Sequence, residues 1–236
     1  LGWETLHAAN PRLVMCAISG YGQRNAWSHR AGHDINYIAM AGVLEQNATV
    51  DGEVAVPNFQ IGDLMGGTQA AVSGMLAALL GAQRSGAGSF VDISMTHEVW
   101  RHHALARITL AATGRPSVPG RDLLSGGAPC YGAYRCADGR YMAVGSLEMK
   151  FWRALCETLE RPQWIERHWT RGLLPGSTES MALRAELAAL FASRTMAQWA
   201  ERFENVDACV TPVLRLDELG THPVHAGGQP IVASSR

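Results

Sequence analysis

Three side chains stand where acid–base chemistry is possible, namely His33, Asp63 and Glu148. His33 follows Gly32 in a loop that leads into an apolar helix, so its imidazole either faces a ligand or has a structural role. Asp63 precedes an Ala- and Leu-rich segment, 64–81, where a carboxylate is either an N-cap or a half-buried base or nucleophile. Glu148 stands at a helix start, where stabilisation of the helix dipole is the simpler explanation. Taken separately, none of the three identifies a reaction.

The surroundings of Asp63 favour chemistry on an oxyanion. A helix N-terminus supplies unpaired N–H groups and a positive dipole, which stabilise a developing negative charge on oxygen. We expect the N–H groups of Asp63 and Leu64 to serve in this way. Gly66 and Gly67 would let a ligand approach the first turn closely.

Patterns typical of cofactor sites are missing from the sequence. The glycines at 81, 86 and 88 do not form the GxGxxG of a dinucleotide site. The five cysteines form no CxxC pair, so neither a zinc site nor a disulfide framework is expected. We therefore predict no metal, no separate cofactor and a reducing, cytoplasmic compartment. The cysteines are Cys16, Cys130, Cys136, Cys156 and Cys209.

Composition restricts the partners. The chain has 236 residues, 47% of them hydrophobic, and a net charge of −1, which argues against a nucleic-acid or membrane-surface binder. No stretch approaches about 18 uninterrupted apolar residues, so no membrane-spanning helix is expected. Charged residues make up only 17%, against about 25% in an average domain. This low share mildly favours a large buried interface and an oligomer, and it equally fits an Ala-rich sequence that has few charges.

The first half of the sequence predicts an α/β layer. A buried strand over 12–17, a helix over 64–81 and a strand over 90–95 occur in series, which favours parallel strands. Thr96 is expected to cap a further helix that runs to about residue 112. This half, 1–115, is predicted to be part of a large α/β domain that carries the catalytic His and Asp.

The second half predicts a small α+β domain over 126–214, joined to the first by a Pro- and Gly-rich linker over 116–125. Asp138-Gly139 separates two alternating runs, which is typical of a β-hairpin. Residues 215–236 are expected to form a truncated return linker. The expected elements are the hairpin strands 130–135 and 140–144, helices at about 149–159, 178–193 and 196–204, and a strand over 209–214.

Several motifs, taken in order, resemble the alpha-methylacyl-CoA racemases of the family III CoA-transferase superfamily. The most specific is AGHDINY at 31–37. The resemblance covers roughly residues 1–225 and implies a partial Rossmann-like large domain with a small α+β domain, truncated at both ends. The other matching stretches are NPRLVMCAISGYGQ at 10–23, GDLMGG at 62–67, SGAGSFVDISM at 85–95, GGAPCYGAYRCADGRYMAVGSLE at 126–148 and DACVTPVL at 207–214.

The resemblance implies a reaction and a site. His33 and Asp63 match the family's catalytic pair, and Glu148 matches the glutamate that orients the histidine. The implied reaction, in lipid and fatty acid metabolism, epimerises a 2-methylacyl-CoA thioester through an enolate, with one base on each face of the α-carbon. CoA is part of the substrate, and full-length relatives form an intertwined homodimer. The segment implied to line the acyl-CoA pocket comprises Gly32, His33, Asp34, Ile35, Asn36 and Tyr37, with Leu64 at the neighbouring helix start.

Two alternatives stay open. In a family III CoA-transferase, the residue matching Asp63 attacks the thioester, although the presence of His33 and Glu148 favours a racemase. The chain could also be a non-catalytic truncated fragment. One departure bears on acyl specificity, since Pro57-Asn58-Phe59 stands where the family usually has Pro-Leu-Asn.

Overall fold

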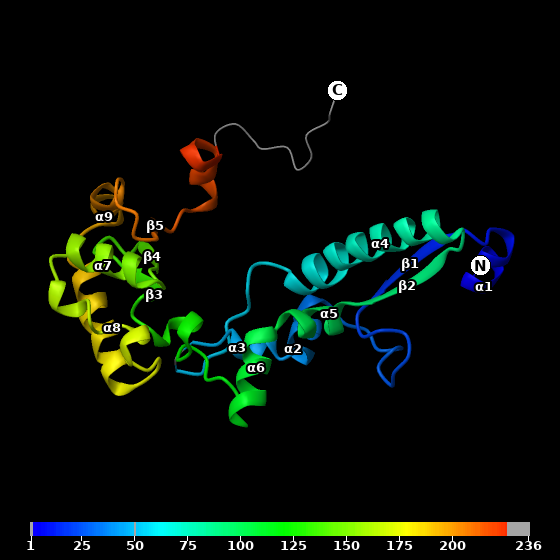
Figure 1. The fold of residues 1–236 in the computed structure, drawn as a ribbon, viewed down its shortest axis with the longest axis horizontal. Helices are drawn as coiled ribbons and strands as arrows, with labels where there is room; N and C mark the ends of the chain where they lie inside the picture. The colour runs from blue at the N-terminus through cyan, green and yellow to red at the C-terminus, as the bar shows by residue number, and fades with distance from the viewer. Residues whose placement is uncertain (1, 50, 226–236) are drawn as a thin grey trace. The chain divides into compact units, whose positions relative to one another are not determined.

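The computed structural model describes residues 2–49 and 51–225. The chain divides into two units, Leu1–Gly120 and Arg121–Arg236, and each combines helices with a small sheet (Figure 1). The predicted mixed α/β class is therefore confirmed. The two units are described separately.

The first unit is built on two parallel strands. β1 (Val14–Ser19) pairs with β2 (Ser89–Ser94) in register from Val14 opposite Ser89 to Ser19 opposite Ser94. The predicted parallel arrangement is confirmed. A long helix packs along both strands (Figure 1).

That helix has an unusual first half. Its opening, η1 (Gly62–Gln69), is a π-helix, and it continues as α4 (Ala70–Ser85). The helix ends at Gly86, whose φ of +77° suits glycine and whose N–H donates to the carbonyl of Ala82. The predicted helix over 64–81 is thus present and longer at both ends.

The same helix bears on the expectation that no membrane-spanning helix is present, which stays a prediction. Gly62–Ser85 has 24 residues, and an 18-residue window within it has a mean hydropathy of 1.3, so the helix is long and apolar enough to cross a membrane by length and composition. Polar residues such as Thr68 and Gln69 interrupt the apolar run, which is why a search for uninterrupted apolar residues misses it. Core helices of soluble proteins meet the same limits, and 17% of that 18-residue window is buried, so this one helix does not decide between the two.

The helix predicted after β2 is broken in two. α5 (Met95–His102) and α6 (Ala104–Thr113) meet at His103, whose ψ of +48° is not helical. The cap is also corrected. Ser94 Oγ accepts the His97 N–H at 3.4 Å, because Ser94 ends the strand in an extended conformation, whereas the Thr96 hydroxyl donates to the carbonyl of Gly20. Three short helices complete the unit: α1 (Trp3–Ala9), α2 (Asp34–Met40) and α3 (Val43–Gln46).

Much apolar surface of the first unit stays uncovered within the described residues. The strand predicted to be buried over 12–17 is at most half-buried over Val14–Ala17, and Ile18, which extends β1, is 51% exposed. Leu76 in the middle of α4 is 63% exposed. The compact part of this unit is a small cluster around Ile38, Ala41 and Val99, which joins α2 to α5.

The second unit begins with η2 (Leu123–Gly127) and contains the predicted hairpin. β3 (Tyr131–Arg135) pairs antiparallel with β4 (Tyr141–Gly145), and β5 (Val210–Pro212) adds to the other edge of β4. In the turn, the Gly139 N–H donates to the carbonyl of Cys136, and the φ of Gly139 is +78°. The predicted hairpin is confirmed, and within its turn Gly139 takes the left-handed conformation that glycine accepts without strain.

Helices with one apolar stripe enclose the core of this unit. In α7 (Met149–Thr158) the buried residues are Trp152, Leu155 and Cys156, which follow the three- and four-residue spacing of one helix face. α8 (Thr178–Phe191) and α9 (Met196–Phe203) bury their own stripes in the same core. Two short 3₁₀ turns, η3 (Pro162–Trp164) and η4 (Trp169–Arg171), connect α7 to α8.

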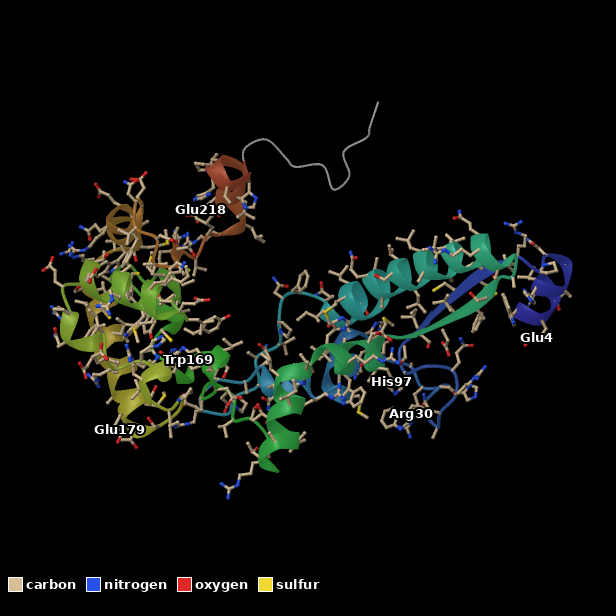
Figure 2. All side chains as sticks on the ribbon, viewed as in Figure 1. Glu4, Arg30, His97, Trp169, Glu179 and Glu218 are labelled. Carbon is tan, nitrogen blue, oxygen red and sulfur yellow. The ribbon has the colours of Figure 1, made fainter. Side chains whose placement is uncertain are left out.

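The segment after β5 is attached to the sheet. It contains η5 (Leu216–Thr221) and η6 (Pro223–His225), and Glu218 accepts two hydrogen bonds from the Arg140 guanidinium at 2.9 and 2.7 Å (Figure 2). The return linker was predicted over 215–236, and residues 226–236 of it lie outside the described residues.

Candidate active site

His33 lies at the start of α2 with its imidazole exposed. Its backbone is extended, with φ −125° and ψ 176°, and its N–H donates to Asn36 Oδ1 at 3.0 Å. Within residues 2–49 and 51–225 the imidazole makes no hydrogen bond and no ion pair. The structure therefore fixes the main chain of His33 and leaves the ring free.

Two tyrosines hold the residue before His33. The Tyr37 hydroxyl donates to the carbonyl of Gly32 at 2.5 Å, and the rings of Tyr21 and Tyr37 pack edge to face. A Cβ on Gly32 would come within 2.6 Å of the Tyr21 hydroxyl oxygen, so no larger residue fits without a shift. The Gly32–His33 peptide is thus fixed by buried neighbours.

Asp63 lies in the first turn of η1 and does not cap it, which corrects the expectation of an N-cap. Ile61 already has helical angles, φ −62° and ψ −39°. The N–H groups expected to be unpaired are also engaged, since Asp63 N–H donates to Asp34 Oδ1 and Leu64 N–H to the Gln60 carbonyl, both at 2.9 Å. The Asp63 side chain itself is exposed.

Asp34 joins the two helix starts. It is the first residue of α2, directly after His33, and its carboxylate reaches the amide of Asp63, 29 residues further along the chain. Burial raises the pKa of Tyr37, and the nearby charges of Asp63 and Asp34 raise it further. The structure therefore places the His33 and Asp63 helix starts side by side.

Glycines also position η1 against α5. A Cβ on Gly66 would come within 2.7 Å of the Met95 carbonyl oxygen and 2.9 Å of a Val99 methyl. Gly67 faces the Met95 side chain in the same way. The two glycines were expected to admit a ligand, but in the structure they let another helix approach. π-helical turns are rare and are often found at functional sites.

Glu148 lies in the second unit, at the start of α7. Its main-chain carbonyl accepts the N–H groups of Phe151 and Trp152, both at 3.0 Å, and no side-chain cap is formed. The carboxylate is exposed and has no hydrogen-bond or ion-pair partner among the residues that the structure describes. Its role in orienting His33 stays a prediction.

Residues that the sequence analysis did not single out hold the turn before Glu148. The buried Ser146 hydroxyl donates to the carbonyl of Ala208 at 2.6 Å, and Trp169 Nε1 donates to the carbonyl of Leu147 at 2.8 Å (Figure 2). Burial lowers the pKa of the neighbouring His168, against a smaller opposing effect of the Ser146 and Leu147 backbone. No local pattern predicts these contacts, because their partners lie 22 and 62 residues away.

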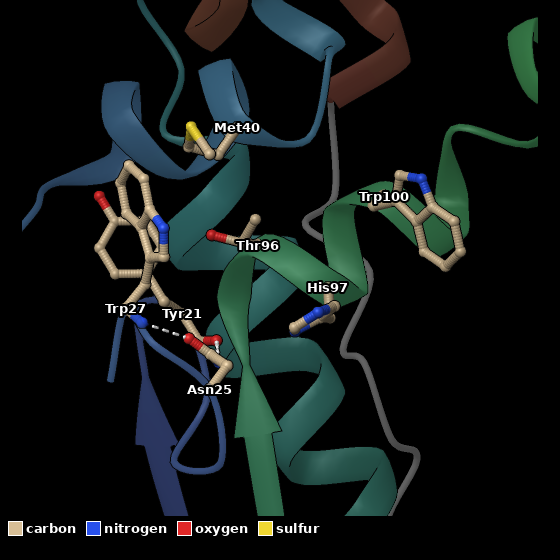
Figure 3. A pocket seen from close by; sticks show the side chains of 7 residues that line it. All are labelled: Tyr21, Asn25, Trp27, Met40, Thr96, His97 and Trp100. Carbon is tan, nitrogen blue, oxygen red and sulfur yellow. Dashed lines mark hydrogen bonds between the residues drawn. The ribbon is translucent and has the colours of Figure 1, made fainter. Parts of the chain in front are cut away.

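An aromatic pocket of about 420 Å³ has Met40, the last residue of α2, among its lining residues (Figure 3). Asn25 fixes one wall, since its side chain accepts the Trp27 N–H and donates to the Tyr21 carbonyl. Neither His33 nor Asp63 lines this pocket. The lining residues are Tyr21, Asn25, Trp27, Met40, Thr96, His97 and Trp100.

Other members of the predicted site are open to solvent. Ile35 is 41% exposed and Leu64 is 44% exposed, so both could contact a ligand, and Asn36 is exposed as well. Over residues 2–49 and 51–225, no group of three or more His, Cys, Asp or Glu side chains is placed to hold a metal ion. The site that the first unit presents therefore consists of an imidazole and a carboxylate on adjacent helix starts.

This arrangement, on a two-unit α/β chain, defines a candidate acid–base enzyme. The family model described as CoA-transferase family III matches residues 1–232, and the chain belongs to that family. The resemblance seen in the motifs is confirmed at this level.

The relatives include racemases and transferases. The chain is 33% identical to alpha-methylacyl-CoA racemase from Homo sapiens over 228 residues, 94% of this chain and 57% of the relative. It is 27% identical to succinyl-CoA:glutarate CoA-transferase from Mus musculus over 225 residues, 93% of this chain and 50% of the relative. The chain thus spans about half the length of these relatives.

A crystal structure supports the fold. A CAIB/BAIF family protein from Brucella suis superposes with a TM-score of 0.72 at 22% identity, over 95% of this chain and 58% of that one. At this identity the likeness establishes the fold alone.

Proposed function

We propose that the chain carries the acid–base site of an isomerase that epimerises 2-methylacyl-CoA thioesters. The observation that carries the proposal is the pairing of a free imidazole, His33, with a free carboxylate, Asp63, on helix starts joined by Asp34. The matches to racemases at 33% and 34% identity support the same reaction.

The proposed chemistry is a balanced proton exchange. One base removes the α-proton, the C–H electron pair moves toward the thioester carbonyl to give an enolate, and the second group returns a proton on the opposite face. His33 and Asp63 alternate as acid and base, and Glu148 orients His33. Because the amides of Asp63 and Leu64 are already paired, we assign them no role as oxyanion donors.

The substrate class, an acyl-CoA of lipid or fatty acid metabolism, comes with this proposal. The cytoplasmic location, the homodimer, and the absence of a metal or separate cofactor and of nucleic-acid or membrane partners stay predictions. A CoA-transferase that uses Asp63 as a nucleophile is the second candidate, and the 27% identical glutarate transferase favours it.

The test is α-deuterium exchange in deuterated water with each enantiomer of a 2-methylacyl-CoA. We expect epimerisation with α-deuterium incorporation by the wild type and loss of epimerisation in both His33→Ala and Asp63→Asn. Each variant should lose α-deuterium incorporation far more from one enantiomer than from the other, and the affected enantiomer should differ between the two variants. His29→Ala, an exposed histidine in the preceding loop, is the matched control and should keep wild-type activity.

Two results would refute the proposal. One is transfer of CoA to a free acid without α-deuterium incorporation, which identifies a transferase. The other is no exchange by the wild type at all, which identifies a non-catalytic chain. Equal losses from both enantiomers in Asp63→Asn would contradict one base per face.

A further inference from the structure

We propose that Asp34 is a positioning residue that holds the Asp63 helix start in register with His33. This inference rests on the proposed function, because it concerns the same two acid–base groups. Its basis is one contact, in which the Asp34 carboxylate accepts the Asp63 main-chain N–H at 2.9 Å.

The contact satisfies a donor that its own helix cannot. The first N–H groups of a helix have no acceptor within the helix. In this helix, Leu64 N–H is the first to find a helical partner, the carbonyl of Gln60, whereas Asp63 N–H has Asp34. A carboxylate is also the favoured charge at a helix N-terminus. Asp34 thus supplies the cap that the sequence analysis assigned to Asp63 itself.

The chain makes room for this cap at Gly62. A Cβ on Gly62 would lie 2.8 Å from Asp34 Oδ1 and 3.4 Å from the Asp34 carbonyl oxygen. Gly62 is buried at this point, and any side chain there would push the carboxylate or the helix aside. The close approach of the two helix starts is therefore built into residues on both sides.

Through Asp34, the position of the His33 main chain is coupled to the position of the Asp63 helix start. Asp34 is covalently next to His33, and it hydrogen-bonds the amide of Asp63 itself. A shift of η1 along its axis would break this bond before it moved the Asp63 carboxylate far. Misplacement of a reacting group by about 1 Å can cost roughly 100-fold in rate. The hydrogen bond between Asp34 and the Asp63 amide can therefore affect catalysis although Asp34 need not contact the substrate.

The kinetic test compares Asp34→Asn with Asp34→Ala in the α-deuterium exchange assay. Asparagine keeps an Oδ1 acceptor and cannot act as a base, whereas alanine removes the acceptor. We expect kcat within about threefold of wild type for Asp34→Asn and roughly 100-fold lower for Asp34→Ala, with KM little changed in both. Asp51→Ala, an exposed loop aspartate, is the control. Equal large losses in both Asp34 variants would identify a proton-transfer role and overturn the positioning role.

An activity-independent test reads the hydrogen bond directly. We expect the Asp63 amide, followed by NMR hydrogen exchange, to exchange roughly 10- to 100-fold faster in Asp34→Ala and in Gly62→Ala than in wild type. Gly81→Ala is the matched control, because a Cβ on Gly81 meets no atom within 4 Å. An unchanged Asp63 amide in Asp34→Ala would overturn the inference.

The two proposals fail in different ways. Wild-type chain without α-proton exchange refutes the proposed function, whatever the amide does. Active wild type with full activity in Asp34→Ala refutes the positioning role and leaves the proposed function standing.

Discussion

The packing of the π-helix against α5 makes a prediction about two alanine substitutions in one continuous helix. Gly66 and Gly81 both lie in Gly62–Ser85, and alanine normally stabilises a helix relative to glycine by about 0.5–1 kcal/mol. Their surroundings differ. A Cβ on Gly66 would come within 2.7 Å of the Met95 carbonyl oxygen, whereas a Cβ on Gly81 meets nothing within 4 Å. The same substitution should therefore have opposite effects on stability.

The magnitudes follow from these distances. Overpacking a well-packed site costs about 1–3 kcal/mol, and the Met95 carbonyl cannot move without moving the start of α5. Against the gain in helix propensity, we expect Gly66→Ala to lower the free energy of unfolding by about 1–2 kcal/mol. For Gly81→Ala only the gain remains, so the free energy of unfolding should rise by about 0.5–1 kcal/mol.

The measurement is urea unfolding of both variants and wild type at matched protein concentrations. The urea concentration at the unfolding midpoint is compared, and an unchanged m value shows that the difference reflects stability. The unfolding midpoint should fall for Gly66→Ala and rise for Gly81→Ala. Because Gly66 lies one turn from Asp63, Gly66→Ala should also lower the α-deuterium exchange activity, whereas Gly81→Ala should leave it unchanged. Shifts of the same sign and size in both variants would refute the described contact between η1 and α5.

Two further predictions concern the second unit. The hydrogen bonds from Arg140 lower the pKa of Glu218 below its usual value of 4.5. The ion pair therefore contributes fully to holding the C-terminal segment above pH 4.5, and this contribution is lost as the pH falls through the lowered pKa of Glu218. Limited proteolysis after β5 should accordingly be slow at pH 7 and faster at pH 3, and Arg140→Gln should be cleaved faster at pH 7, whereas equal rates in both proteins would contradict the role of the ion pair. Burial raises the pKa of Cys130 and Cys156 to about 12, so peptide mapping after iodoacetamide at pH 8 should find exposed Cys209 modified first and those two only after unfolding; modification of Cys130 in the folded chain at the rate of Cys209 would contradict its burial.

Local patterns in the sequence were sufficient where local physics decides the structure. The turn at Asp138-Gly139 forms as predicted, because only glycine accepts its left-handed backbone without strain. α7 was predicted from 149, and its buried Trp152, Leu155 and Cys156 show why, since one apolar stripe at helical spacing suffices.

Tertiary contacts were beyond such patterns. The hydrogen bond from Asp63 to Asp34 links residues 29 apart, so the sequence pointed to the helix start and assigned the cap to the wrong aspartate. The break at His103 lies inside a continuous helical pattern with no glycine or proline to mark it. β1 was wrongly predicted to be buried. An apolar run shows that a strand would be stabilised by burial, whereas its actual exposure depends on which other elements cover it. Glycines were the available signals of close approach at the site, and Gly62, directly before Asp63, is the one that faces Asp34.

Membership of the family does not distinguish epimerisation from CoA transfer, because Asp63 would serve in both reactions. The distinction depends on His33. A nucleophilic mechanism at Asp63 places no demand on a neighbouring imidazole, yet the structure fixes the peptide between Gly32 and His33 at its carbonyl and at its N–H. Tyr37 holds the carbonyl of Gly32, and Asn36 holds the N–H of His33, while the ring stays unbonded in the described residues. An exposed ring on a fixed main chain is available for proton transfer to a bound α-carbon. This arrangement of His33 is the structural reason for preferring the epimerase.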